Sequence, residues 1–135
     1  MSIISTNLHR VQNRIRIACE QANREPSSVK LLAASKRTDA NGIREAISLG
    51  HYLYGENRAQ SLRDKYDTVA VEHPEATWHF IGYLQKNKIK YIVGRASMVH
   101  SIDSFELAEA LSNRIRQQNQ SGKDIPPIKI LVQVK

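Results

Sequence analysis

The sequence predicts an α/β protein in which the short strands of a parallel sheet alternate with helices. Five short runs have the length of strands, and the first of them is nearly all apolar, which is typical of a strand buried in such a sheet. Amphipathic segments separate these runs, and the connections are long enough for right-handed crossovers. With 135 residues, 41% of them hydrophobic, the chain can form one domain, residues 1–135, with its own core.

This alternation fits two architectures, an open doubly wound sheet and a (β/α) barrel. A dinucleotide-binding open sheet would carry the segment G-x-G-x-x-G after its first strand. No such segment follows the first predicted strand, which weakens the dinucleotide interpretation. The order of the strands is left open by the pattern alone.

The first predicted unit is an amphipathic helix over residues 5–24, followed by a strand over residues 29–34. Apolar residues of the helix are three and four positions apart and predict one buried stripe: Leu8, Val11, Ile15, Ala18 and Ala22. Pro26 ends the helix. The run that follows is apolar except for Lys30, which indicates a strand buried on both faces.

The second predicted unit begins with a helix that Thr38 or Asp39 can cap. Its buried side would be Ile43, Ala46 and Ile47, and Gly50 would end it. The predicted elements that follow are a strand at 52–54, a helix at 58–67, a strand at 77–81 and a helix at 85–91.

The last predicted unit starts with a strand at 98–102. Asp103 is predicted to cap the next helix, with Glu106 as its capping-box partner. That helix would bury four residues on one side: Leu107, Ala110, Leu111 and Ile115. After a polar loop and two prolines, residues 128–134 are predicted to form a fifth strand.

Composition and charge exclude several classes of protein. The single cysteine, Cys19, excludes an intramolecular disulfide and predicts a reducing, cytoplasmic setting. Neither a signal peptide nor an apolar run near the roughly 20 residues of a membrane helix is found. The net charge of +7 permits contact with phosphates or nucleic acid. Dedicated nucleic-acid binding is not expected, because no aromatic ladder accompanies the basic patches, of which Lys86, Lys88 and Lys90 with Arg95 are the densest.

Polar residues end or occupy four of the predicted strands. Functional groups of parallel α/β folds gather at the carboxyl ends of the strands, so these residues would share one mouth. They are Lys36 after the first strand, Asn57 after the second, His79 in the third, and His100 and Ser101 in the fourth. Each also has a structural interpretation: Asn57 as a turn residue, and the histidines as hydrogen-bonded core residues. The absence of Glu or Cys at ligand spacing argues against a metal site.

Lys36 is the most informative of these residues. Directly after a buried strand, its amine would lie at the rim of an apolar interior, where desolvation favours the neutral form that attacks an aldehyde. The alternative is a lysine that extends to solvent at a strand end. Position alone does not decide between the two.

The sequence resembles the pyridoxal phosphate homeostasis proteins, relatives of the N-terminal barrel of alanine racemase. Four motifs occur in the family's order and spacing: Leu31-Leu32-Ala33-Ala34-Ser35-Lys36, Tyr54-Gly55-Glu56-Asn57, Trp78-His79-Phe80-Ile81-Gly82 with Leu84-Gln85-Lys86-Asn87-Lys88, and His100-Ser101-Ile102-Asp103-Ser104. The resemblance implies the N-terminal portion, about five strands, of a TIM-like (β/α)8 barrel of the alanine racemase type.

The resemblance also implies a function. Lys36 would hold pyridoxal 5'-phosphate as a Schiff base, with Asn57, His79 and Ser101 lining the cofactor pocket. Family members are regarded as holding and delivering the cofactor, with pyridoxal-phosphate-requiring apoenzymes as partners, rather than as robust enzymes. An amino-acid racemase is the first alternative, although no second acid/base group is identifiable. A basic module that binds RNA or another protein is the second.

The sequence departs from the family pattern in two ways. Thr38-Asp39 replaces the usual lysine-proline pair, and Lys135 stands where the family usually has asparagine after the fifth strand. A full barrel has about eight strands, and its phosphate is held by the loops after the last ones. The resemblance therefore implies a natural truncation or a fragment without the phosphate cradle. We expect its exposed sheet edges to favour self-association or flattening into an open sheet.

Overall fold

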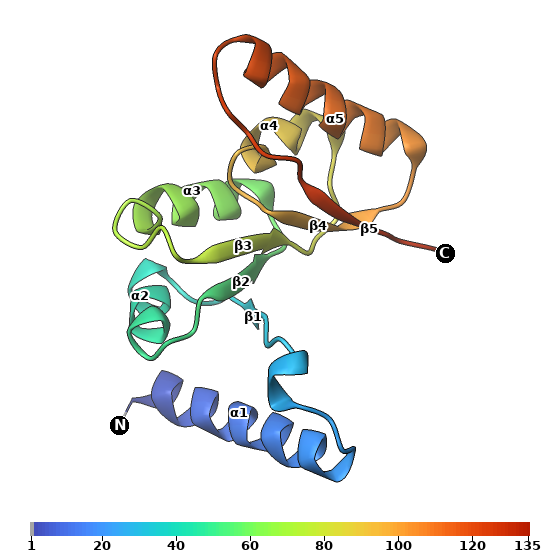
Figure 1. The fold of residues 1–135 in the computed structure, drawn as a ribbon. Helices are drawn as coiled ribbons and strands as arrows, with labels where there is room; N and C mark the ends of the chain where they lie inside the picture. The colour runs from blue at the N-terminus through green and yellow to red at the C-terminus, as the bar shows by residue number, and fades with distance from the viewer. Residues whose placement is uncertain (1) are drawn as a thin grey trace.

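A computed structural model describes residues 2–135 and contains one parallel five-stranded sheet (Figure 1). Its strands are β1 (Ala33–Ala34), β2 (Leu53–Glu56), β3 (Thr77–Phe80), β4 (Met98–Ile102) and β5 (Lys129–Val132). The α-helices are α1 (Ile3–Gln21), α2 (Ala40–Ser48), α3 (Ala59–Val69), α4 (Ile89–Ile92) and α5 (Phe105–Gln120). Two 3₁₀ turns complete the order: η1 (Pro26–Ser28) before β1 and η2 (Lys86–Lys88) before α4.

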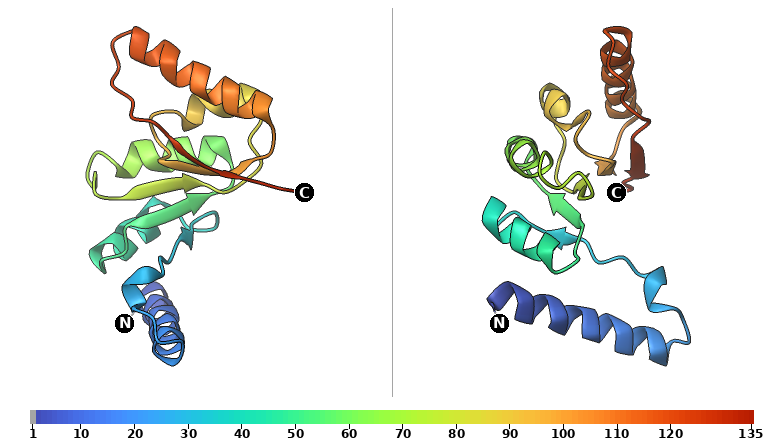
Figure 2. Two further views of the ribbon diagram at one scale, coloured as in Figure 1. Left: turned by 45° about the vertical axis from the view of Figure 1, so that its right-hand side comes forward. Right: turned by 60° about the vertical axis from the view of Figure 1, so that its left-hand side comes forward.

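The order of the strands decides between the two architectures. Each strand pairs in parallel with the next strand in the chain, which gives the order β1-β2-β3-β4-β5. A doubly wound sheet would reverse direction and place later strands on the other side of β1. Helices α2 to α5 lie along one face of the sheet in both views of Figure 2. The chain is therefore a partial (β/α) barrel, as the resemblance implied.

The core lies between the sheet and these helices, in two clusters. One cluster joins α2 to β2 and β3 around Tyr54 and Trp78, whose rings lie 5.4 Å apart. The Tyr54 hydroxyl donates a hydrogen bond of 2.7 Å to the backbone oxygen of His51, and burial raises the pKa of Tyr54. The other cluster joins α3, α4 and α5 to β3 and β4 around Leu62, Phe80 and Val99.

The caps of two helices test the predicted boundaries. Asp39 caps α2 by accepting a hydrogen bond of 2.9 Å from the backbone N–H of Gly42, which confirms one of the two predicted caps. The predicted cap of α5 is wrong. Ser104, not Asp103, has extended backbone angles before the first turn and accepts from the Leu107 N–H at 3.1 Å. With Ser104 as the cap, the helix begins one residue later and the predicted capping box does not form.

Both edges of the sheet are largely exposed, although the first strand was predicted to be buried. Of the predicted strand 29–34, only Ala33–Ala34 pairs, and every residue of β5 is exposed. The prediction that the first strand is buried on both faces assumed neighbours on each side. Within residues 2–135, β1 pairs with β2 alone and β5 with β4 alone.

The predicted buried stripe of α1 is also wrong. Ser5 and Cys19 are its buried residues, whereas Leu8 and Ile15 are half-buried and Val11 is exposed. Helix α1 begins beside α2 and then extends away from the sheet, as the right-hand view of Figure 2 shows. Too little of the molecule lies against its far half to cover the stripe. No helix among residues 2–135 combines the length and apolarity needed to cross a membrane.

Candidate functional site

The ends of β2, β3 and β4 meet at Gly82. A Cβ atom at position 82 would lie 2.0 Å from the backbone oxygen of Asn57, so only glycine permits this approach. The Ser101 hydroxyl donates a hydrogen bond of 2.5 Å to the backbone oxygen of Gly82. Two residues predicted for the site, Asn57 and Ser101, are therefore brought to the same point. Asn57 is exposed there, and Ser101 is buried.

Lys36 lies beyond the end of β1, two residues after its last paired residue. Its side chain is exposed, so its amine is accessible to a small molecule. Of the two interpretations that the sequence left open, this exposure matches the lysine that extends to solvent at a strand end. The physical reason is that β1 forms an edge of the sheet, with a strand on one side of it only.

His79 lies in β3 and forms a pair with His100 of β4. The Nδ1 atom of His79 is 2.9 Å from the Nε2 atom of His100, a distance at which one ring donates a hydrogen bond to the other. Burial lowers the pKa of His79, and nearby His100, Lys30 and Lys129 lower it further. The pair therefore favours a neutral ring at position 79.

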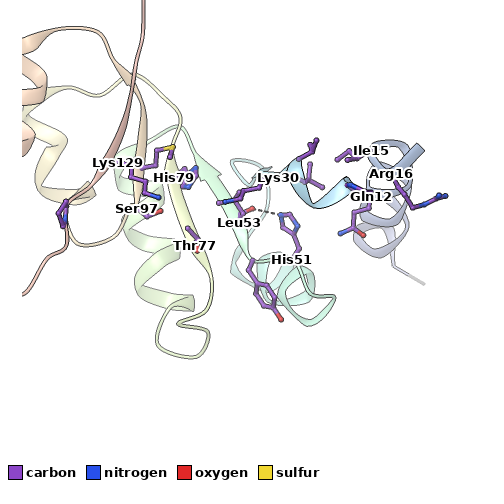
Figure 3. A pocket seen from close by; sticks show the side chains of 16 residues that line it. Gln12, Ile15, Arg16, Lys30, His51, Leu53, Thr77, His79, Ser97 and Lys129 are labelled. Carbon is purple, nitrogen blue, oxygen red and sulfur yellow. Dashed lines mark hydrogen bonds between the residues drawn. The ribbon is translucent and has the colours of Figure 1, made fainter. Parts of the chain in front are cut away.

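His79 also lines a groove of about 830 Å³ on the side of the sheet away from helices α2 to α5 (Figure 3). The starts of the strands contribute Leu53, Thr77, Met98 and Lys129, and α1 contributes Gln12, Ile15 and Arg16. Lys36, Asn57 and Ser101 do not line this groove. The structure thus separates the groove, with His79, from the strand ends where the other predicted residues lie.

A buried polar cluster behind Lys36 was not predicted. Glu56, the last residue of β2, is 0% exposed, and its carboxylate accepts hydrogen bonds from the Ser35 hydroxyl and from Lys65 of α3. The Lys65 Nζ atom lies 3.1 and 3.2 Å from the two carboxylate oxygens. It also donates a hydrogen bond of 2.6 Å to the backbone oxygen of Ser35. The predicted strand ended at residue 54, before Glu56, so nothing in the sequence indicated that this carboxylate would be buried and would require a partner.

The basic patch is partly neutralised within the chain. Arg95 forms an ion pair of 2.9 Å with Asp67. Its Nη1 atom donates to the backbone oxygen of Tyr91, and its Nη2 atom donates to the Asp67 carboxylate. Arg63 lies over the ring of Tyr91 at 4.5 Å, with Lys90 at 5.2 Å from the same ring. This arrangement leaves less free charge for a nucleic acid than the sequence count indicates. Among residues 2–135, no group of three or more His, Cys, Asp or Glu side chains is arranged to hold a metal ion.

Comparisons with known proteins agree with this fold. No family model matches the sequence. The curated pyridoxal phosphate homeostasis protein of Aquifex aeolicus is 43% identical over 112 residues, which are 83% of this chain and 48% of that protein. The chain spans about half the length of the curated relatives it matches.

Two solved structures share the arrangement. A crystal structure of an unknown protein from Bifidobacterium adolescentis has a TM-score of 0.80 and 34% identity, over 94% of this chain and 58% of that chain. The structure of PipY from Synechococcus elongatus, with PLP bound, has a TM-score of 0.68 and 36% identity, over 89% of this chain and 53% of that chain.

Sequence identity and fold thus point to one group of proteins. Curated relatives named pyridoxal phosphate homeostasis protein are 31% to 43% identical to this chain, over 83% to 99% of its length. The solved relatives wind their chains as this partial barrel does, at a similar level of identity. The chain belongs to the pyridoxal phosphate homeostasis protein family, about half the length of whose members it spans.

Proposed function

We propose that this chain binds pyridoxal 5'-phosphate and holds it as a Schiff base on Lys36. The observation that carries the proposal is an exposed lysine amine directly beyond β1, at the end of the sheet where parallel α/β folds bind ligands. A solved relative at 36% identity has PLP bound, which supports the choice of cofactor. An accessible primary amine is the group that an aldehyde requires.

The residues present fit such a cofactor in different ways. Asn57 is exposed beside Gly82, so its amide is available to a polar ring substituent. The Ser101 hydroxyl is engaged by Gly82, so Ser101 would support the pocket wall rather than bond the cofactor. His79 lies nearer the groove, where its neutral ring and the basic side chains of Lys30 and Lys129 face open space. We propose that His79 forms the part of the pocket wall that lies toward the starts of the strands.

We further propose that the chain contributes to vitamin B6 homeostasis, not to robust catalysis. This role comes from the names of the relatives, of which the chain spans about half. It would hold the cofactor for release to apoenzymes that require it, in the cytoplasm. The racemase alternative requires a second acid/base group opposite Lys36, and our proposal assigns that role to no residue among 2–135.

The test is spectroscopic. The chain mixed with pyridoxal phosphate should develop a visible absorption band from the Schiff base, and Lys36→Ala should abolish it. Lys123→Ala is the matched control, because Lys123 is another exposed lysine, lies in the connection between α5 and β5, and should leave the band unchanged. Borohydride reduction and peptide mass spectrometry should place the adduct on Lys36. An adduct on a different lysine, or no band in the unaltered chain, would refute the proposed binding.

A further inference from the structure

Lys36 projects from a weakly paired part of the sheet. Strand β1 pairs with β2 at two positions only, Ala33 with Tyr54 and Ala34 with Gly55. A short edge strand frays readily, because few hydrogen bonds hold it. An amine that must meet a cofactor in one geometry therefore needs another attachment.

Ser35 supplies that attachment through all of its polar groups. Its backbone N–H donates a hydrogen bond of 3.0 Å to the Gly55 oxygen. Its hydroxyl donates to the Glu56 carboxylate. Its backbone oxygen accepts from Lys65 Nζ at 2.6 Å and from the Thr38 N–H at 3.0 Å. That oxygen belongs to the peptide group that joins Ser35 to Lys36, so Lys65 restrains the backbone of Lys36 directly.

Stability alone does not account for the ion pair between Glu56 and Lys65, because burying its charges costs free energy. Glu56 is fully buried, and Lys65 retains 17% of its side-chain exposure. Removing two charges from water costs several kcal/mol each, and buried ion pairs are often no more stabilising than apolar residues of the same size. A buried ion pair does fix direction, because each oxygen and each N–H must meet its partner. Here the direction is imposed on Ser35.

We propose that Glu56 and Lys65, acting through Ser35, are positioning residues for Lys36. Glu56 holds the Ser35 side chain toward α3, and Lys65 holds the Ser35 carbonyl. Lys36 and Arg37 form the turn that follows Ser35, and the hydrogen bond from the Thr38 N–H to the Ser35 oxygen closes it. Fixing Ser35 therefore fixes where this turn, with Lys36 in it, leaves β1. The inference rests on the proposed function of Lys36 and deepens it by naming the residues that set its geometry.

The test compares variants that remove each part of the cluster. Glu56→Gln keeps the size of the side chain and removes its charge, and Ser35→Ala removes the hydroxyl link alone. Because Glu56→Gln leaves Lys65 without its counter-charge, the double variant Glu56→Gln/Lys65→Met guards against a failure to fold. Asp67→Asn is the control: Asp67 lies on the same helix as Lys65, and the substitution breaks its ion pair with Arg95 without touching Ser35.

Two measurements read the position of Lys36. The first is the rate constant of Schiff-base formation with pyridoxal phosphate, compared at equal folded fractions judged by circular dichroism. We expect it to fall about tenfold in Glu56→Gln, Ser35→Ala and the double variant, and Lys65→Arg to retain most of the rate. The second needs no cofactor: amide hydrogen exchange of residues 35–38 should accelerate about tenfold in the same variants, with exchange of β3 unchanged.

The outcomes separate this inference from the proposed function. If the unaltered chain forms no Schiff base, the proposed function fails and the inference fails with it. If the unaltered chain forms the Schiff base on Lys36 but the variants react and exchange as Asp67→Asn does, the inference alone is overturned. Slower reaction together with faster exchange at 35–38, confined to the cluster variants, supports it.

Discussion

The ionisation of His79 is set by its position in β3, next to His100 and near two lysines. Its pKa lies below the ordinary value of 6.5 because burial and positive neighbours both oppose a charged ring. The unfolded chain has neither effect and takes up a proton as the pH falls through 6.5. Between that pH and the lowered pKa, unfolding is therefore linked to proton uptake, and the folded state loses stability.

We predict that His79→Gln reduces the loss of stability on acidification. The urea midpoint of the unaltered chain should fall between about pH 7.5 and about pH 5, and the variant should fall less, because glutamine does not titrate. His9→Gln is the control, since His9 is exposed on α1 and should leave the pH dependence as it was. Equal pH dependence in the unaltered chain and in His79→Gln would contradict the assignment.

At the same scale, sequence reasoning identified which residues stand at the strand ends but not their surroundings. Asn57 and Ser101 were predicted to share one mouth, and both approach Gly82. The sequence left the environment of Lys36 open, because its burial depends on which strands lie beside β1 rather than on the sequence around it. Glu56 was missed as a buried ion for the same reason, since its partner Lys65 comes from the following helix.

Helix α5 provides a test at the scale of one element. Ser104→Ala removes the side chain that accepts from the Leu107 N–H, and should destabilise the chain by about 1 kcal/mol. Asp103→Ala, one residue earlier, should have a smaller effect because Asp103 makes no capping bond in α5. Urea unfolding of both variants measures the difference. A larger loss in Asp103→Ala would restore the cap that the sequence suggested.

The junction between β2 and β3 provides a second test. Gly82→Ala places a Cβ atom against the backbone of Asn57, a contact that the chain can relieve only by separating the two strand ends. We expect a loss of roughly 1–3 kcal/mol in the free energy of unfolding, as for other overpacked sites. Tyr83→Ala, at the exposed neighbouring position, should change stability far less. Unaltered stability in Gly82→Ala would show that the two strand ends are not in contact.

Local patterns predicted which segments are helices and which are strands. They predicted the first and last residues of these elements less accurately. Periodic apolar residues such as Ile43 and Leu111 placed the helices, because helix burial repeats within a few residues. The cap of α5 depended on which of two neighbouring side chains meets the Leu107 N–H, which the composition of the segment does not specify. The predicted helix at 85–91 divides into η2 and α4, which are too short for the periodicity of apolar residues to distinguish.

The whole molecule presents apolar residues along β5. Val132 is 72% exposed, and Ile130 and Leu131 are exposed beside it. Within residues 2–135 this strand pairs on one side only, so it offers unpaired backbone groups together with apolar side chains. Such an edge is a template for pairing with another chain.

We predict that the chain self-associates in a concentration-dependent way and that Val132→Lys weakens this association. A lysine on an edge strand must be desolvated before a second strand can pair there. Val71→Lys is the matched control, because Val71 is 86% exposed in the connection between α3 and β3, away from the edge. Light scattering after size-exclusion chromatography measures the mass. A monomer at every concentration would contradict the prediction.

At this largest scale, the alternation of elements predicted the fold class, whereas the strand order required either the resemblance or the structure. Both the barrel and the doubly wound sheet satisfy the same local pattern, because they differ only in which strands become neighbours. Exposure of the α1 stripe likewise depended on how far that helix extends beyond the sheet.

Because every strand pairs with the strand next to it in the chain, the sheet can grow in the order in which the ribosome releases it. Each new β–α unit finds its docking surface already in place, and no strand has to wait for a distant segment to emerge. Pairing each strand with its neighbour in the chain keeps every loop closure as short as a parallel crossover allows. The register at Ala33 and Tyr54 can therefore form while later units are still being synthesised.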